Sequence, residues 1–228
     1  MTGRPAPTVL PSSLRPWLGL VAVLAALVVG AIGILYAGHG EPGRVDRWFI
    51  APTADSVRPP WRYVALTLDF LGEPAGSVMV IVAAVVGCVL LRLPRVAVLV
   101  VAGVGLTVGT ATLLKHVVGR TIHGADNLSY PSGHTAFFTA LALTAALPAT
   151  GRLGLGRAAG MSLVLAAALA AGAAMGWAEV ALGAHYPTDA LGGWCTALAV
   201  VPATAWLVDR AADQRAVRTA DAGRLERR

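Results

Sequence analysis

Long apolar runs separated by short polar gaps dominate this chain. The runs cover residues 17–37, 74–93, 96–114, 133–150, 158–177 and 189–208. Each is close to the ~20 residues that an α-helix needs to cross the hydrocarbon core of a bilayer. The pattern predicts an all-α fold, a polytopic six-transmembrane helical bundle over residues 17–208. It lies between an N-terminal segment, 1–16, and a polar tail, 209–228.

The first apolar run has two interpretations, a cleaved signal peptide and a retained membrane anchor. It is flanked by Trp17 and Tyr36, and no small-x-small cleavage site follows it. A signal peptide has a shorter apolar region of about 7–15 residues and ends at such a site. We therefore expect a retained first span.

The composition supports a protein of the membrane. Hydrophobic residues make up 56% of the chain, charged residues 13%, and the mean hydropathy is +0.68. A soluble domain has about 25% charged residues. The isoelectric point of about 10.1 would also suit a nucleic-acid-binding protein, but the arginines cluster in the gaps between apolar runs and in the tail. No nucleic-acid partner is therefore expected.

The charges of the gaps predict the orientation in the cell membrane. One set of segments (1–16, 92–95, 151–157 and the tail) holds twelve basic residues and four acids, and the opposite set holds six basic residues and eight acids. Cytoplasmic segments carry the excess of basic residues, so both termini are expected in the cytoplasm. Loops 38–73, 115–132 and 178–188 then face outside, and all five histidines fall on that side. The aromatic residues of 38–73 suit short amphipathic segments at the interface, either as anchors or as a rim where a lipid enters.

The sequence Pro131-Ser132-Gly133-His134 opens the fourth apolar run. Serine is a favourable helix N-cap, and the free backbone N–H groups of a helix N-terminus bind anions. Glycine lets an anion approach the backbone closely. Capping alone accounts for Ser132 and Gly133, but it leaves His134 beside the anion site unexplained.

His185 and Asp189 are four residues apart and share a helix face if a helix runs through them. An aspartate that accepts a proton from one imidazole nitrogen leaves the other nitrogen free to attack a substrate or to bind a metal. Such a pair is also a common structural capping interaction, so its spacing alone leaves both interpretations open.

Lys115 and Arg120 flank the outer end of the third run, and Lys115 is the one lysine of a chain with 17 arginines. A lysine at the end of a span commonly serves as an interfacial anchor. Together the two cations are also suited to neutralising a phosphate in a partly dry pocket.

In combination these motifs resemble the type 2 phosphatidic acid phosphatase (PAP2) superfamily, which shares its core with vanadium haloperoxidases. The resemblance implies a PAP2/haloperoxidase-like helical core and a phosphatase that acts through a phosphohistidine. It makes His185 the nucleophile, Asp189 its orienting partner and His134 the general acid. It makes Lys115, Ser132 and Gly133 ligands of the phosphoryl oxygens.

That family has three motifs, Lys-x6-Arg-Pro, Pro-Ser-Gly-His and Ser-Arg-x5-His-x3-Asp, and the first and third are incomplete here. The arginine and proline of the first motif fall on Ile122 and His123, and the serine and arginine of the third fall on Ala178 and Glu179. Arg120, two residues before the first missing arginine, is the candidate replacement that binds the phosphate. For Glu179 we consider contact with a substrate hydroxyl or a pair with Arg120. Asp126 and Asn127 either reach the site or are solvated loop residues.

The leading hypothesis is a metal-independent, cofactor-free membrane phosphatase that hydrolyses a lipid phosphate at the outer face. A polyprenyl diphosphate, a phosphatidate-like lipid and a phosphorylated glycolipid all fit. The alternatives are a phosphotransferase with the same intermediate, a non-catalytic lipid-phosphate binder, and a metal enzyme that would need a third ligand such as His116 or His123. The sequence predicts no oligomeric state.

Overall fold

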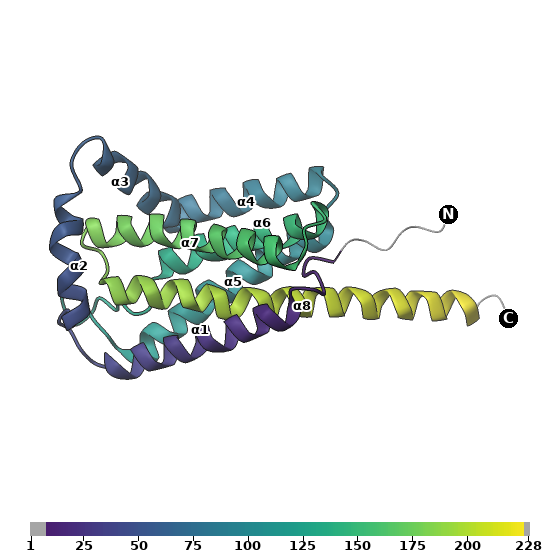
Figure 1. The fold of residues 1–228 in the computed structure, drawn as a ribbon, viewed down its shortest axis with the longest axis horizontal. Helices are drawn as coiled ribbons and strands as arrows, with labels where there is room; N and C mark the ends of the chain where they lie inside the picture. The colour runs from purple at the N-terminus through teal and green to yellow at the C-terminus, as the bar shows by residue number, and fades with distance from the viewer. Residues whose placement is uncertain (1–7, 226–228) are drawn as a thin grey trace.

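The structure is a computed structural model that describes residues 8–225, with side chains described to residue 218. Residues 1–7 and 226–228, which include Arg4, Arg227 and Arg228 of the predicted cytoplasmic ends, lie outside the described residues. The described part is all-helical (Figure 1). Its helices are α1 (Arg15–Leu35), α2 (Arg44–Asp55), α3 (Trp61–Gly72), α4 (Pro74–Leu90), α5 (Pro94–Val118), α6 (Gly133–Arg152), α7 (Arg157–Ala181) and α8 (Pro187–Leu225).

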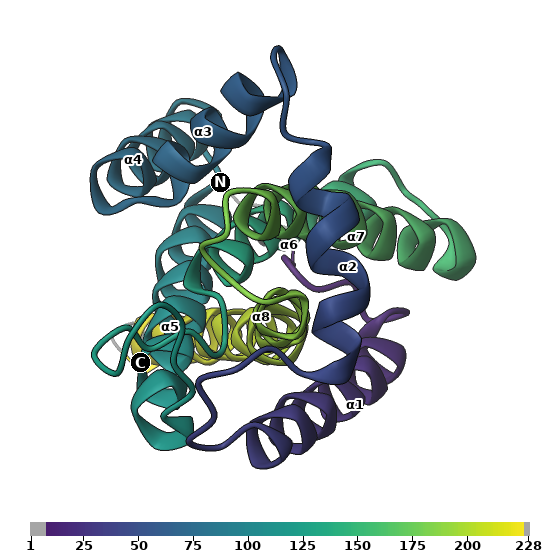
Figure 2. The same ribbon diagram turned by 90° about the vertical axis from the view of Figure 1, so that its left-hand side faces the viewer.

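The long helices α1, α4, α5, α6, α7 and α8 begin within two residues of the six predicted runs. Their ends agree less well, because α8 continues unbroken past residue 208 to Leu225. The loop 38–73 folds into α2 and α3, two helices of 12 residues each. Figure 2 shows α2 lying across the end of the bundle, over the ends of α7 and α8.

Four helices, α1, α5, α7 and α8, are long and apolar enough to cross a membrane. The count rises to five if α3 and α4, which meet at a 74° bend, form one broken span. The prediction of six spans is therefore confirmed only in part. The difference lies in α6, which carries four buried threonines and packs against α3, α5, α7 and α8, so its surroundings are mostly protein.

The core of the bundle is built from aliphatic and small residues of α1, α5, α6, α7 and α8. Its largest fully buried aliphatic side chains include Leu18, Leu99, Leu143 and Leu147. Large apolar side chains on the outer faces of α1, α4 and α5 are exposed, among them Leu27, Leu90 and Leu113. Because exposed apolar faces of this extent mark a protein or membrane contact, they suit a bilayer environment.

The end of the bundle away from α2 is held by Asp209 of α8. Its carboxylate accepts hydrogen bonds from the backbone N–H groups of Val9 and Leu10, both at 2.9 Å. Arg95, at the start of α5, lies 3.4 Å from the same carboxylate. This buried aspartate therefore ties the N-terminal segment and the α4–α5 turn to α8.

We predict that Asp209→Ala destabilises the protein by about 3–5 kcal/mol, because it leaves two buried N–H groups without their acceptor and removes the buried one of the two carboxylates that pair with Arg95. Thermal unfolding in detergent measures this change as a lower midpoint. Asp213→Ala is the matched control, because Asp213 also pairs with Arg95 but its side chain is 60% exposed, and such pairs contribute less than about 1 kcal/mol. Equal midpoints for the two variants would contradict the assignment.

Candidate active site

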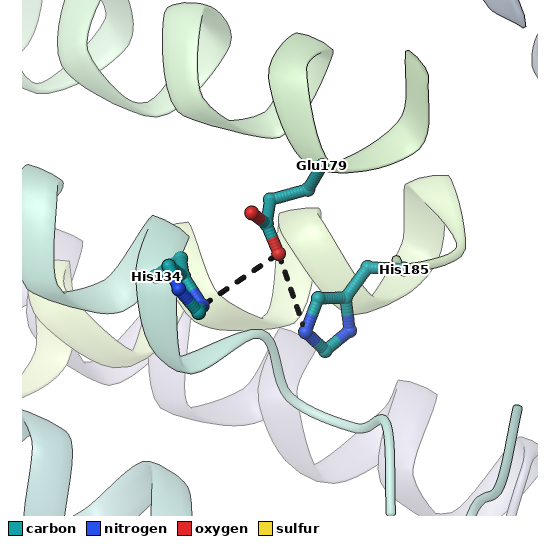
Figure 3. Close-up of side chains that lie close together, drawn as sticks. All are labelled: His134, Glu179 and His185. Carbon is teal, nitrogen blue, oxygen red and sulfur yellow. Dashed lines mark ion pairs between the residues drawn. The ribbon is translucent and has the colours of Figure 1, made fainter. Parts of the chain in front are cut away.

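The predicted site residues gather at the end of the bundle that α2 covers. His134 comes from the first turn of α6, Glu179 from the last turns of α7, and His185 from the loop that joins α7 to α8 (Figure 3). That loop turns back on itself, because the Glu179 carbonyl accepts a hydrogen bond from the Ala184 N–H at 2.8 Å. The two histidines are thereby brought to opposite sides of one carboxylate.

The predicted helix start at Ser132 is present. The Ser132 Oγ accepts a hydrogen bond from the Thr135 N–H at 3.2 Å and caps α6. The Ser132 N–H donates to the Asp189 carbonyl at 2.9 Å, which joins this motif to the start of α8. His134 lies directly against Gly72, where a Cβ would overlap the imidazole ring. Glycine at the end of α3 therefore allows His134 its position.

His185 and Asp189 form the expected pair, with Nδ1 and Oδ2 separated by 3.6 Å. The same carboxylate oxygen accepts the Tyr186 N–H at 3.0 Å, and the other oxygen accepts from Arg120 at 2.7 Å. Asp189 is fully buried and His185 is 8% exposed. Asp189 is therefore fixed in place before any substrate binds, and it faces one nitrogen of His185.

Arg120 has partners other than the phosphate that the sequence suggests. Its guanidinium is fully buried and pairs with Asp46 and Asp189, each at 2.7 Å, and donates to the Thr188 hydroxyl at 2.6 Å. The rings of Tyr36 and Tyr186 lie over the guanidinium, with centroids 4.1 and 4.5 Å from Cζ. These contacts use both terminal nitrogens within the protein, so the geometry favours a positioning role over phosphate binding.

Asp46 was missed by the sequence analysis, although it belongs to the same buried network. Its carboxylate accepts hydrogen bonds from the N–H groups of Thr188 and Gly43 and from Arg120. Burial raises the pKa of Asp46, but these hydrogen bonds together lower it by more than burial raises it. The pKa of Asp46 therefore lies below the ordinary value of 3.8. The local signal was an acidic residue in the first turn of α2, where the Asp46 carboxylate accepts the Gly43 N–H.

Glu179 replaces a family arginine and lies between the histidines. Its Oε2 is 3.5 Å from His185 Nε2 and 3.7 Å from His134 Nδ1 (Figure 3). The residue is 1% exposed, and neither carboxylate oxygen has a hydrogen-bond partner among the described residues. Of the two roles considered for Glu179, the geometry does not favour pairing with Arg120, because Glu179 lies against the two histidines and Arg120 pairs with Asp46 and Asp189.

Two further acids approach His134 from the junction of α3 and α4. The Nε2 atom of His134 lies 4.0 Å from Asp69 and 3.7 Å from Glu73. The 74° bend between these helices turns both carboxylates toward the site. The aromatic residues of this segment indicated a place at the membrane interface, but nothing in the sequence connected it with His134.

Of the remaining predicted residues, some lie at the site and others lie away from it. Lys115, in the last turn of α5, interacts electrostatically with Asp189 and Glu179, and Gly133 is the first residue of α6. His116 and Asp126 are exposed. The His123 ring contacts the Gly183 carbonyl at 2.7 Å. Neither His116 nor His123 belongs to a group of described residues able to share a metal ion with the two site histidines.

A model of the PAP2 superfamily matches residues 95–213, slightly more than half of the chain. The chain belongs to the PAP2 superfamily. Members of this superfamily are phosphatases that act on phosphate-containing substrates. Neither the curated proteins nor the solved structures include a significant match to the chain. Within this PAP2 chain, the family's first arginine position is occupied by Ile122, which is buried.

We predict that Asp46→Asn lowers the thermal midpoint, because breaking a buried ion pair costs about 3–5 kcal/mol. Asp55→Asn, at the exposed end of the same helix, is the control and should leave the midpoint unchanged. The loss should also depend on pH. The pKa of Asp46 is depressed in the folded protein, so its stabilisation is present above about pH 4 and is lost as the pH falls through the folded-state pKa.

Unfolding midpoints of the wild type and Asp46→Asn, measured from pH 7 down to pH 3, provide the test. The two curves should converge at the acid end. A constant separation over this range would show that the charge of Asp46 is not what stabilises the network.

Proposed function

We propose that this protein hydrolyses the phosphate monoester or diphosphate of a lipid at the extracytoplasmic face of the cell membrane, through a phosphohistidine on His185. The observation that carries the proposal is that a buried histidine, His185, and a partly buried one, His134, lie at one site in a PAP2 chain. Asp189 stands behind the nucleophile at 3.6 Å. A lipid-phosphate binder would have no need of this arrangement.

In the first step, the Nε2 lone pair of His185 attacks phosphorus in line. The bond from phosphorus to the lipid oxygen breaks, and that oxygen takes a proton from protonated His134. In the second step, His134 takes a proton from a water molecule, whose oxygen attacks phosphorus while the P–N bond breaks. Inorganic phosphate leaves, and His185 regains its lone pair. Asp189 accepts a hydrogen bond from the Nδ1–H of His185 and stabilises the charged imidazole.

The phosphoryl oxygens would be held by Lys115, the Gly133 N–H and the capped N-terminus of α6. Backbone N–H groups at a helix start carry partial positive charge toward an anion. Binding a phosphoryl group between the histidines requires the Glu179 carboxylate to turn away from His185. Once turned, it is available to a hydroxyl group of the substrate. Arg120 acts through Asp189 and is a positioning residue in this mechanism.

Two features support a lipid as the substrate. An apolar groove of about 330 Å³ runs between α7 and α8, lined by Leu169, Trp177, Leu191, Trp194 and Phe49 of α2. Its lining also includes Val180 and Ala190, the sequence neighbours of Glu179 and Asp189. Exposed aromatic side chains on α2 and α3, among them Trp48 and Trp61, suit the membrane interface. Polyprenyl, phosphatidate-like and glycolipid tails would all suit such a groove.

The proposed topology has both termini in the cytoplasm. The basic gaps at 92–95 and 151–157 join helices at the end of the bundle away from α2, and the C-terminal part of α8 extends from that same end (Figure 1). The acid-rich segments lie with the site at the α2 end. This asymmetry follows the positive-inside pattern.

We predict that His185→Asn abolishes phosphate release from lipid phosphates and that His134→Asn lowers it by about 10²–10⁴-fold, the usual contribution of general acid–base catalysis. His116→Asn, which changes an exposed histidine of α5, should retain wild-type release. The measurement is phosphate release by the purified protein in detergent with EDTA, from a diphosphate, a phosphatidate and a phosphoglycolipid.

The intermediate is tested separately by rapid quenching with labelled lipid phosphate. An acid-labile, base-stable label on the wild type, absent from His185→Asn, is expected. Release by His185→Asn at the wild-type rate would refute the nucleophile. Binding of lipid phosphates with no release from any of them would instead assign a binding function.

A further inference from the structure

The three groups of Figure 3 have unsatisfied ligand atoms in a buried space. Both oxygens of Glu179, and the far nitrogens Nδ1 of His185 and Nε2 of His134, lack a hydrogen-bond partner among the described residues, and Glu179 Oε2 lies between the near nitrogens of the two rings. A buried carboxylate without a partner costs free energy unless it is neutralised by a proton or a cation. The separations of 3.5 and 3.7 Å from Oε2 to the imidazole nitrogens are longer than the 2.7–3.2 Å or so of a hydrogen bond.

The same separations fit a shared metal ion. Zinc binds histidine nitrogen at about 2.0–2.1 Å and carboxylate oxygen at about 2.0–2.2 Å, usually in tetrahedral geometry. Ligand atoms around such an ion lie about 3.3–3.6 Å apart, as this geometry requires. The ligand atoms of His134, Glu179 and His185 all lie within 4.8 Å of one another. Small side-chain adjustments would bring all three into coordination.

The far nitrogen of each histidine faces a carboxylate. Nδ1 of His185 lies 3.6 Å from Asp189, and Nε2 of His134 lies 3.7 Å from Glu73. A metal-binding histidine characteristically donates its second N–H to a carboxylate, which orients the ring and raises its basicity. These two distances are longer than hydrogen bonds, but each far nitrogen has a carboxylate near enough to accept its N–H after a small side-chain adjustment, while the near nitrogens lie toward Glu179.

The charge of the surroundings also favours a cation. The single charge of Arg120 is more than neutralised by Asp46 and Asp189. Asp69, Glu73 and Glu179 remain around the histidines, and Lys115 supplies a single opposing charge. In the family's third motif an arginine stands at position 179, and it would repel a metal ion. The glutamate in this chain supplies a ligand in its place.

We propose that His134 Nδ1, Glu179 Oε2 and His185 Nε2 bind one divalent cation of the zinc class, with a fourth position open to water. Two nitrogens and one carboxylate are a ligand set that zinc accepts. The consequence, which rests on the proposed function, is that the bound cation inhibits phosphate release. It occupies the lone pair with which His185 would attack phosphorus. The cation and the phosphohistidine exclude each other.

Zinc binding is tested on the full-length protein in detergent, stripped with EDTA and dialysed against buffered zinc. Metal analysis should find one zinc per chain, and cobalt should give the visible absorption of a tetrahedral site. Glu179→Gln and His134→Gln should each weaken zinc binding by about 100-fold or more. Loss of a residue that only hydrogen-bonds to a metal ligand already costs up to about 100-fold, and loss of a ligand should cost at least as much. Asp126→Asn, which removes an exposed carboxylate at the same end of the protein, should bind as the wild type does.

Inhibition is tested by the ratio of phosphate release in zinc to release in EDTA, measured for each protein. The ratio should be far below one for the wild type and Asp126→Asn, and close to one for Glu179→Gln. Thermal unfolding of the variants shows whether each is folded. Because the two ligand substitutions lie on separate helices, one variant can still test the site if the other does not fold.

The outcomes separate the two proposals. Absence of zinc from the folded wild type would overturn the metal site and indicate that a proton neutralises Glu179. Stoichiometric zinc with an unchanged ratio would overturn the inhibition. Release that requires zinc would confirm the site but refute the phosphohistidine route. Absence of release both in EDTA and in zinc would refute the proposed function, while the zinc count would still decide the site.

Discussion

The rest of the site depends on the ion pairs made by the buried guanidinium of Arg120. The guanidinium lies between the carboxylates of Asp46 and Asp189, at 2.7 Å from each, and so joins α2, the α5–α6 loop and the start of α8. Removing one member of a buried ionic group leaves an uncompensated charge at high cost. Because Asp189 is held by this network and by the Tyr186 N–H, its position behind His185 is determined by segments far apart in the sequence.

The sequence predicted those parts of the fold and site that depend on local pattern. Hydrophobic runs located the long helices, and short motifs identified Ser132, His134, His185 and Asp189, each of which lies at this end of the bundle. It could not predict the partners of Arg120, because Asp46 comes from a separate helix and is recognised only through packing. Asp69 and Glu73 were missed for the same reason. Their approach to His134 requires the bend between α3 and α4.

Membership of the PAP2 superfamily and the local chemistry of this chain point to related but distinct properties. The family's histidines and aspartate are present, whereas Ile122 and Glu179 stand where its two arginines are expected. A phosphate in this pocket would therefore depend on Lys115 and on the backbone N–H groups at the start of α6. The glutamate at position 179 places a carboxylate 3.5 Å from His185 Nε2, where the family motif would supply the opposite charge.

The continuity of α8 has a consequence for how the protein sits in its membrane. Asp189 in the first turn and Asp209 lie on one unbroken helix, twenty residues and so about 30 Å apart. That length equals the hydrocarbon thickness of a typical bilayer. Asp209 is bonded to the N-terminal segment at one end of the bundle, and Asp189 is bonded to Arg120 at the other end. The helix α8 is therefore held at two points along its length. The helix therefore fixes the separation between the two anchored ends of the bundle at a length close to the thickness of a bilayer core.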